Sequence, residues 1–289
     1  MWIFPAVLSS FANALLASVN QRYQIKGEVL IIWRGLIPAL LLAPFLLFFS
    51  APADPVFYLF VGLNACIVRF TDAWFFETVR RYGASLPLKL NPLIVIFVFM
   101  AWLIIDPGQR EAMAQHPWVA IGVGGSLLAS LLMLALMTRC HVTAEAFRFY
   151  LPRMAGGVLI DIFNKQAMLA AYGWSGPIYY AALISAAIFF LSLPHMRIYV
   201  RQGRLREEMR RSWVAGCMIG ILSVAGMLTK NLAMFSVPNP AYVTTIIMAS
   251  SLWVIVYARL RRRPDPGPIL PSLGFLASAI ILIILVKML

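Results

Sequence analysis

Charged side chains interrupt several long apolar stretches of this 289-residue chain, and they are the residues best suited to chemistry. A charge near the centre of a bilayer costs about 2.5–3.5 kcal/mol on insertion scales, so a charge retained there indicates a functional site. The bases outnumber the acids, which favours a solute that carries negative charge. The basic residues are Arg34, Arg69, Lys89, Arg153, Lys165 and Lys230, and the acidic ones are Asp72, Glu77 and Asp161.

The spacing of these charges predicts which of them share a helical face. Within residues 149–172, Arg153, Gly157, Asp161 and Lys165 recur every four residues, which is one face of a helix. Asp161 could therefore pair with Arg153 or Lys165 and only lock helices together, instead of binding a solute.

Two other sets of charges lead to different expectations. Arg69 and Asp72 lie three residues apart, so they too could form an internal pair. Lys89 and Lys230 have no acid at helical spacing, which makes them better solute ligands unless they extend to a membrane interface.

Polar residues complete the predicted site. Asn13 lies on a milder polar stripe near the start of the chain, and Asn91 precedes Pro92, which frees a backbone carbonyl. The predicted solute-binding residues are Asn13, Arg69, Asp72, Lys89, Asn91, Arg153, Asp161, Lys165 and Lys230. Arg34 and Glu77 are expected to have gating or structural roles.

Composition indicates what positions these residues. The chain is 62% hydrophobic and 12% charged, which excludes an ordinary soluble enzyme, a disordered protein and a disulfide scaffold. A helix of about 20 apolar residues crosses a bilayer. The sequence predicts ten such helices, at 2–20, 29–50, 56–77, 84–105, 118–137, 149–172, 177–193, 213–235, 241–258 and 272–288. Gly216 and Gly220 predict close helix packing within one of them.

The basic residues outside these stretches predict the orientation. Most of the 24 lysines and arginines fall on one side of the membrane, whereas Arg110 and Lys287 fall on the other. The crowded side includes a basic loop at about 195–212, for which a surface helix on anionic lipid and a solvated loop are both open. The crowded side is expected to be cytoplasmic, which places both termini on the non-cytoplasmic side. The high positive charge therefore reflects topology and contact with membrane lipids, not nucleic-acid binding.

The two halves of the chain resemble each other weakly. Asn20 at the end of the first stretch aligns with Asn164 in the sixth, and Gly83-Ala84-Ser85 aligns with Pro240-Ala241-Tyr242. Five spans per half make the halves inverted, so we expect repeats at 1–140 and 141–289. Inverted repeats place a binding site between the halves, near the middle of the membrane.

The sequence resembles the drug/metabolite transporter superfamily, in its ten-helix branch with two EamA-type repeats. The resemblance rests on Trp33-Arg34-Gly35, on Phe76-Glu77-Thr78, on Leu90-Asn91-Pro92-Leu93, and on basic residues near the ends of spans one and six, Arg22 and Lys165. It implies that spans one, three, four, six, eight and nine line a central cavity. The family usually has its termini inside, opposite to the orientation that the charges predict.

The sequence therefore predicts an all-α polytopic protein of two inverted five-helix repeats, in a membrane such as the bacterial inner membrane. The predicted function is secondary transport of a small anionic or phosphate-bearing metabolite by alternating access. Alternatives are a flippase for a lipid-linked phosphate headgroup, an exporter of amino acids or cationic drugs, and a non-transporting scaffold. A homodimer is compatible with this plan.

Catalytic features are lacking in the sequence. His116, His141 and His195 have no cysteine or carboxylate at metal-ligand spacing, and no Gly-Lys-Ser/Thr phosphate loop occurs. We therefore expect no enzyme, no metal and no cofactor. Coupling to a proton or another ion stays open, with Asp72 and Asp161 as the deep acids.

Overall fold

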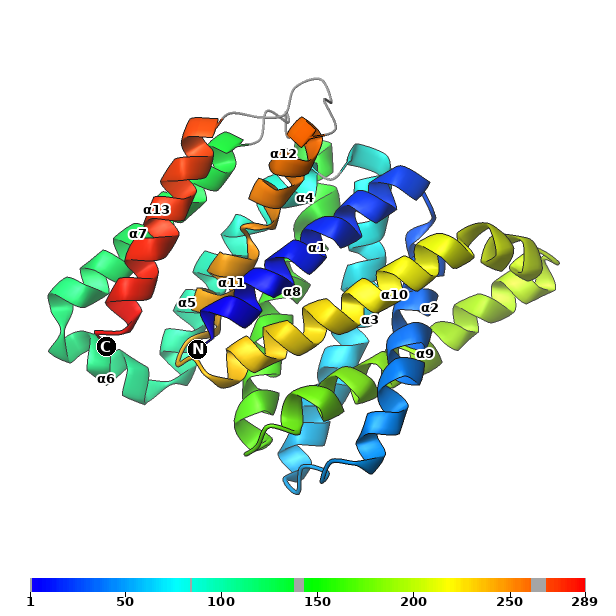
Figure 1. The fold of residues 1–289 in the computed structure, drawn as a ribbon, viewed down its shortest axis with the longest axis horizontal. Helices are drawn as coiled ribbons and strands as arrows, with labels where there is room; N and C mark the ends of the chain where they lie inside the picture. The colour runs from blue at the N-terminus through cyan, green and yellow to red at the C-terminus, as the bar shows by residue number, and fades with distance from the viewer. Residues whose placement is uncertain (1, 84, 138–142, 261–268, 289) are drawn as a thin grey trace.

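The computed structural model describes residues 2–83, 85–137, 143–260 and 269–288. Within these ranges the chain is all-helical and has no β-strand, as expected for an all-α protein (Figure 1). The elements in chain order are α1 (Ile3–Tyr23), α2 (Gly27–Leu42), the 3₁₀ helix η1 (Ala43–Leu47), α3 (Pro55–Tyr82), α4 (Ser85–Leu90), α5 (Pro92–Ile105), α6 (Pro107–Gln115), α7 (Pro117–Met137), α8 (Ala144–Ala170), α9 (Gly176–Arg201), α10 (Leu205–Phe235), α11 (Pro240–Ile247), α12 (Ser250–Leu260) and α13 (Ile269–Val286).

Short polar side chains fix where several of these helices begin. Asp54, Asp106, Thr143 and Asn239 each accept a hydrogen bond from a backbone N–H in the first turn of α3, α6, α8 and α11, respectively. Such N-caps satisfy donors that the helix itself cannot satisfy. In three of these helices a proline follows directly at the first position, where its missing N–H costs nothing. The breakers between the apolar stretches therefore act as helix starts.

Six helical segments in the described ranges are long and apolar enough to cross a membrane. They are α1, α2 with η1, α3, α9, α10 and the pair α11–α12. A seventh is added if Leu93–Ile105 and Pro107–Gln115, which meet at an angle of 98°, form one broken span. These segments indicate an integral membrane protein.

Each of the ten stretches expected from the sequence falls on one helix or on two consecutive helices. Two of these stretches, those on α8 and on α4–α5, do not form one continuous apolar span. The charged residues of α8 lower its hydropathy, and α4–α5 is interrupted at Asn91. α7 and α13 are apolar helices of 21 and 18 residues.

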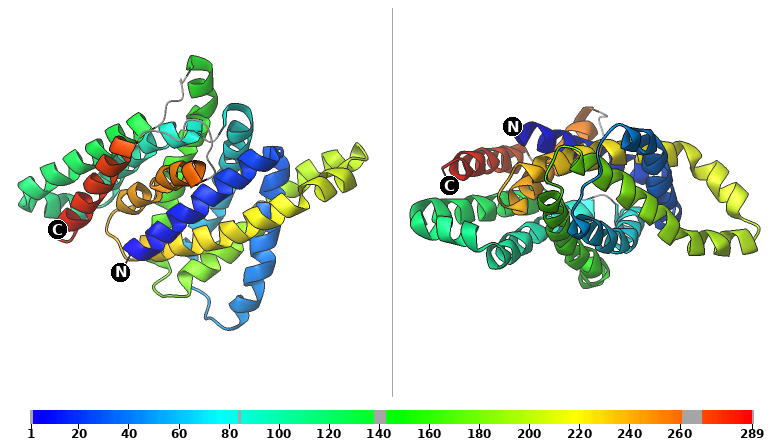
Figure 2. Two further views of the ribbon diagram at one scale, coloured as in Figure 1. Left: turned by 45° about the horizontal axis from the view of Figure 1, so that its top comes forward. Right: turned by 90° about the horizontal axis from the view of Figure 1, so that it is seen from below.

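Pairs of helices from the two halves of the chain lie side by side. α1 lies along α10, α3 along α8, α2 along α9, and α7 along α13 (Figures 1 and 2). α10 also packs closely on α2: a Cβ added at Gly216 would lie 2.2 Å from Cγ of Trp33, and one at Gly220 would lie 2.4 Å from Cβ of Ile37. The close packing predicted for these two glycines is confirmed, and their partner is α2.

The basic segment at 195–212 is helical except for one tight turn, so of the two structures expected for it the solvated loop is wrong. α9 continues to Arg201 and α10 begins at Leu205, so only a tight turn separates them, with Gly203 at a φ of 66°. At 1.5 Å per residue, the 31 residues of α10 span about 46 Å, well beyond a hydrocarbon core of about 30 Å. The hairpin extends at one end of the long axis, with the start of α1 and the end of α13 toward the other (Figures 1 and 2).

Candidate functional site

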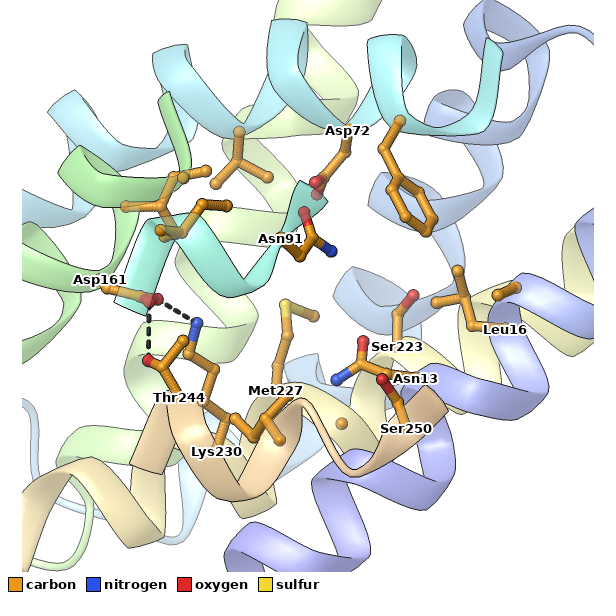
Figure 3. Close-up of a pocket in the computed structure, with 18 of the residues that line it drawn as sticks. Asn13, Leu16, Asp72, Asn91, Asp161, Ser223, Met227, Lys230, Thr244 and Ser250 are labelled. Carbon is orange, nitrogen blue, oxygen red and sulfur yellow. Dashed lines mark hydrogen bonds and ion pairs between the residues drawn. The ribbon is translucent and has the colours of Figure 1, made fainter. Parts of the chain in front are cut away.

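A cavity of about 170 Å³ lies where the two halves of the chain meet, between α1, α2, α3, α5, α8, α10 and α11 (Figure 3). This volume holds on the order of ten water molecules, or one small metabolite. Seven residues named from the sequence are among those that line it: Asn13, Arg34, Asp72, Asn91, Arg153, Asp161 and Lys230.

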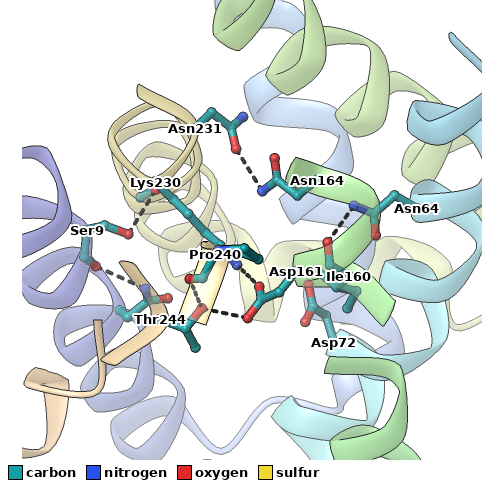
Figure 4. A network of polar contacts seen from close by, with 12 residues as sticks. Ser9, Asn64, Asp72, Ile160, Asp161, Asn164, Lys230, Asn231, Pro240 and Thr244 are labelled. Carbon is teal, nitrogen blue, oxygen red and sulfur yellow. Dashed lines mark hydrogen bonds and ion pairs between the residues drawn. The ribbon is translucent and has the colours of Figure 1, made fainter. Parts of the chain in front are cut away.

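One set of polar contacts in the cavity, the Asp161 cluster, consists of Asp161, Lys230 and Thr244. Nζ of Lys230 lies 2.5 Å from Oδ1 of Asp161, and the Thr244 hydroxyl donates to Oδ2 at 2.7 Å (Figures 3 and 4). Asp161 is 3% exposed, so this carboxylate is satisfied almost entirely by protein groups. The cluster joins α8 to α10 and α11.

A second set, the Asp72 cluster, consists of Asp72, Arg34 and Arg153. Nη2 of Arg34 lies 2.8 Å from Oδ2 of Asp72, whereas Nη2 of Arg153 lies 3.7 Å from Oδ1. A contact of 3.7 Å is too long for a hydrogen bond. Arg34 is therefore the nearer ion-pair partner of Asp72, although Oδ2 of Asp72 has no hydrogen-bond partner among the described residues. The cluster joins α2, α3 and α8.

The two clusters are separated along α8. Arg153 and Asp161 are eight residues apart, which corresponds to about 12 Å along a helix. Gly157 lies between them on the same face and also lines the cavity. The helical face predicted from the spacing of Arg153, Gly157 and Asp161 is thus the face that borders the cavity.

The cavity has more positive than negative groups. Among its described lining residues, Arg34, Arg153 and Lys230 are basic, and only Asp72 and Asp161 are acidic. Nε of Arg34 and both Nε and Nη1 of Arg153 are buried and have no hydrogen-bond partner among the described residues. The described lining residues therefore carry one positive charge in excess, and several of their N–H donors lack a hydrogen-bond acceptor.

Two residues expected in the site have other roles. The predicted pair of Arg69 with Asp72 is wrong: Nη2 of Arg69 donates to Oε2 of Glu28 at 2.6 Å, and Arg69 does not line the cavity. The reason is geometric, because Arg34 on α2 and Arg153 on α8 reach Asp72 from neighbouring helices.

Lys165 also lies away from the cavity. Its Nζ donates to the carbonyl oxygens of Met234 at 2.9 Å and Val237 at 2.5 Å, so it satisfies carbonyls at the end of α10. The predicted pairing of Asp161 with Arg153 or Lys165 is wrong as well, since the partner of Asp161 is Lys230. Lys230 has no acid at helical spacing along α10, as the sequence indicates, but Asp161 reaches it from α8.

The remaining predicted residues divide between the cavity and the surface. Glu77 pairs with Arg80 and Arg81 on the same helix and lies outside the cavity, which agrees with a structural role. Asn91 accepts a hydrogen bond from the Tyr150 hydroxyl at 2.6 Å. Lys89 belongs to α4, but its side chain lies outside the described residues.

Sequence reasoning missed several cavity residues, notably Thr244 and Ser223. A hydroxyl in an apolar helix usually hydrogen-bonds to a carbonyl one turn earlier, so its presence in the sequence carries little signal. The Thr244 hydroxyl does lie 3.1 Å from the Pro240 carbonyl oxygen as well as near Asp161. Only the folded structure shows the second contact.

Buried amides support the walls of the cavity (Figure 4). Asn164 donates to Asn231 at 2.9 Å and joins α8 to α10, and Asn20 donates to the Phe76 carbonyl at 3.0 Å and joins α1 to α3. Asn64 donates to the Ile160 carbonyl at 3.1 Å and to the Tyr180 hydroxyl. These contacts position α8, the helix that contributes to both clusters.

Comparisons with known proteins give no family for the chain: no family model matches it, and no curated protein matches it in sequence. The described residues contain no group of three or more histidine, cysteine, aspartate or glutamate side chains that could hold a metal ion. The chemistry that the arrangement can perform is therefore judged from the cavity itself, whose charges are suited to binding a small polar solute within a membrane.

Proposed function

We propose that the chain is a secondary transporter that moves a small metabolite by alternating access, with a preference for an anionic or phosphate-bearing solute. The observation that carries this proposal is the cavity between the two halves, lined by charges from both of them. A charged cavity within a membrane protein is typical of a solute pathway.

The helix contacts support two inverted five-helix repeats. An axis that exchanges the halves would relate the α1–α10 contact to the α8–α3 contact, and would map the α2–α9 and α7–α13 pairs onto themselves. The discontinuities support the same division, since α4–α5 breaks at Asn91 and α11–α12 breaks at Met248, the same number of residues after the aligned Gly83 and Pro240. Discontinuous helices at a repeat interface are characteristic of transporter binding sites.

The ends of the chain support an even number of crossings. The start of α1 and the end of α13 lie toward the same end of the molecule (Figure 1). An even number agrees with ten spans better than with seven. We propose that both ends face away from the cytoplasm and that the arginine-rich α9–α10 hairpin lies in it, as the positive-inside rule predicts.

The charge of the cavity favours an anion over a cation. Both acids already have basic partners, whereas the guanidinium of Arg153 lacks hydrogen bonds to described residues. An exported cation would meet a cavity with an excess of positive charge, which is repulsive. Cationic drugs are therefore less well matched than a small anion.

Counterflow in proteoliposomes tests this proposal. The purified protein is reconstituted into liposomes preloaded with an unlabelled carboxylate, phosphate ester, amino acid or organic cation, and uptake of the same radiolabelled compound is followed. We expect transient accumulation of an anionic compound that Asp161→Asn abolishes, with Arg197→Gln on the exposed hairpin as the unaffected control. Absence of counterflow for all four classes contradicts transport.

A further inference from the structure

Arg153 is the least satisfied charged group in the cavity. Its Nη2 lies 3.7 Å from Asp72, and its Nε and Nη1 are buried without hydrogen-bond partners among the described residues. A buried donor without a partner costs about 1–3 kcal/mol, and more when the group is charged. A guanidinium in this state should donate hydrogen bonds readily to a negatively charged group that carries oxygen atoms.

We infer that Arg153 binds the single oxyanion group of the solute, so that the solute is a small organic acid with one carboxylate or phosphate group and an apolar body. This inference rests on the proposed transport function. It assigns the charge and shape of the solute and names the residue that selects it.

The charge of the solute follows from the balance of the two clusters. The charge of Lys230 balances that of Asp161, and the charge of Arg34, 2.8 Å away, balances that of Asp72. Among the described lining residues, the positive charge of Arg153 then has no acid to balance it. A single negative charge, as on a carboxylate, neutralises the cavity, whereas a phosphate monoester, with a charge of about −1.5 to −2 at pH 7, slightly exceeds its bases.

Gly157 leaves room for the guanidinium of Arg153 at the wall of the cavity. Gly157 has no side chain, and a Cβ placed there would lie 2.8 Å from Nη1, so the guanidinium occupies space that any other residue would fill. On the other side its Cζ lies 5.9 Å from the centre of the Phe75 ring. The weak contact to Asp72 is easily exchanged for a bidentate contact to an oxyanion.

The rest of the cavity fits the apolar body. Beside the charged clusters, the lining is largely hydrophobic and comes from Leu16, Val68, Phe75, Ile94, Ile160 and Met227. A volume of about 170 Å³ admits a small molecule. A cavity that combines one guanidinium with a largely hydrophobic lining selects a molecule with one acidic group and an apolar remainder.

Thermal stability of the purified protein measures this binding without any transport step. Melting temperatures are recorded at constant ionic strength in butanoate, benzoate or phenyl phosphate, and in butanamide or benzamide as uncharged counterparts. At least one acid is expected to raise the melting temperature of the wild type by about 2–4 °C more than the amides do, because a ligand stabilises the state that it binds. Comparing benzoate with phenyl phosphate distinguishes a carboxylate from a phosphate solute.

Arg153→Gln is expected to remove the difference between acid and amide. This variant keeps the Arg34–Asp72 pair, so we expect it to fold; Arg153→Lys, which keeps the charge without the planar fork, should retain only part of the difference. Arg197→Gln, far from the cavity on α9, should respond as the wild type does.

Three results would overturn the assignment of Arg153: no acid stabilises the wild type, amides stabilise it as well as acids do, or the acid effect persists in Arg153→Gln. Different results would contradict the proposal of transport. Acid binding through Arg153 without counterflow would contradict transport and keep the binding site, whereas counterflow of neutral or cationic solutes would keep transport and refute the site.

Discussion

Asp161 takes its charged partner from a helix 69 residues further along the chain. Asp72 likewise takes Arg34 and Arg153 from two other helices. Spacing along one helix predicts only partners three or four residues away. The residues of the site were therefore largely predictable from charge and hydropathy, but their pairing depends on which helices are neighbours, and that information is absent from local spacing.

The Asp161–Lys230 pair should show energetic coupling. Removing one member of a buried pair leaves the other uncompensated, so Asp161→Asn and Lys230→Met should each lower the free energy of unfolding, and the double variant should cost less than their sum by about 1–3 kcal/mol. The three variants are compared with the wild type by thermal or denaturant unfolding in detergent. Lys230 is partly exposed, which weakens the expected coupling. Strict additivity of the two single variants would show that the contact contributes nothing to stability.

Lys165 should matter for stability and not for the solute. Lys165→Met leaves the Met234 and Val237 carbonyls without their donor, which is expected to cost about 1–3 kcal/mol of unfolding free energy. Transport per folded molecule should be kept, with Asp161→Asn as the inactive comparison. Loss of transport in Lys165→Met at wild-type stability would return this lysine to the solute pathway.

The positions of the helices were predictable from the length of the apolar stretches and from the breakers between them. Where a helix continues or is interrupted was not. The segment at 195–212 is rich in arginine, glutamate and methionine, which are good helix formers, so the helices extend where charge alone suggested a loop. The interruption at Asn91 agrees with the following proline, whereas the interruption at Met248–Ala249 has no glycine or proline to mark it. Tertiary contacts decide such a break.

The contact between α10 and α2 should depend on Gly216. A methyl group there would meet the Trp33 ring at 2.2 Å, so Gly216→Ala should destabilise the protein by about 1–3 kcal/mol through overpacking. Gly124 on α7 is the matched control, because a Cβ there meets nothing within 4 Å. Gly124→Ala should be neutral, or stabilising by up to about 1 kcal/mol, in the same melting experiment. Equal melting temperatures for the two variants would refute this packing.

At the scale of the whole molecule, distribution of charge predicts orientation, but not which helices meet. The pairing of α1 with α10 and of α3 with α8 was not derivable from composition, since apolar stretches resemble one another. The cavity is lined by residues from both halves of the chain, and the sequence predicted a site between the halves.

Fusion reporters test the orientation. A reporter active only outside the cytoplasm should be active after Leu289, and one active only inside should be active when inserted in the turn Gln202–Arg204, because the arginine-rich end is retained in the cytoplasm. Each reporter placed at the other position serves as the control. The reverse pattern at both positions would place the arginine-rich hairpin outside and contradict the charge-based orientation.

Accessibility of the cavity from the two sides tests alternating access most directly, and it requires no knowledge of the solute. Ser223, which is 3% exposed and lines the cavity, is replaced by cysteine after Cys66, Cys140 and Cys217 are changed to serine. A membrane-impermeant thiol reagent is then added to oriented vesicles from one side or the other. Alternating access predicts modification of Ser223→Cys from both sides, with the serine-only protein unlabelled; modification from one side alone, or from neither, would contradict it.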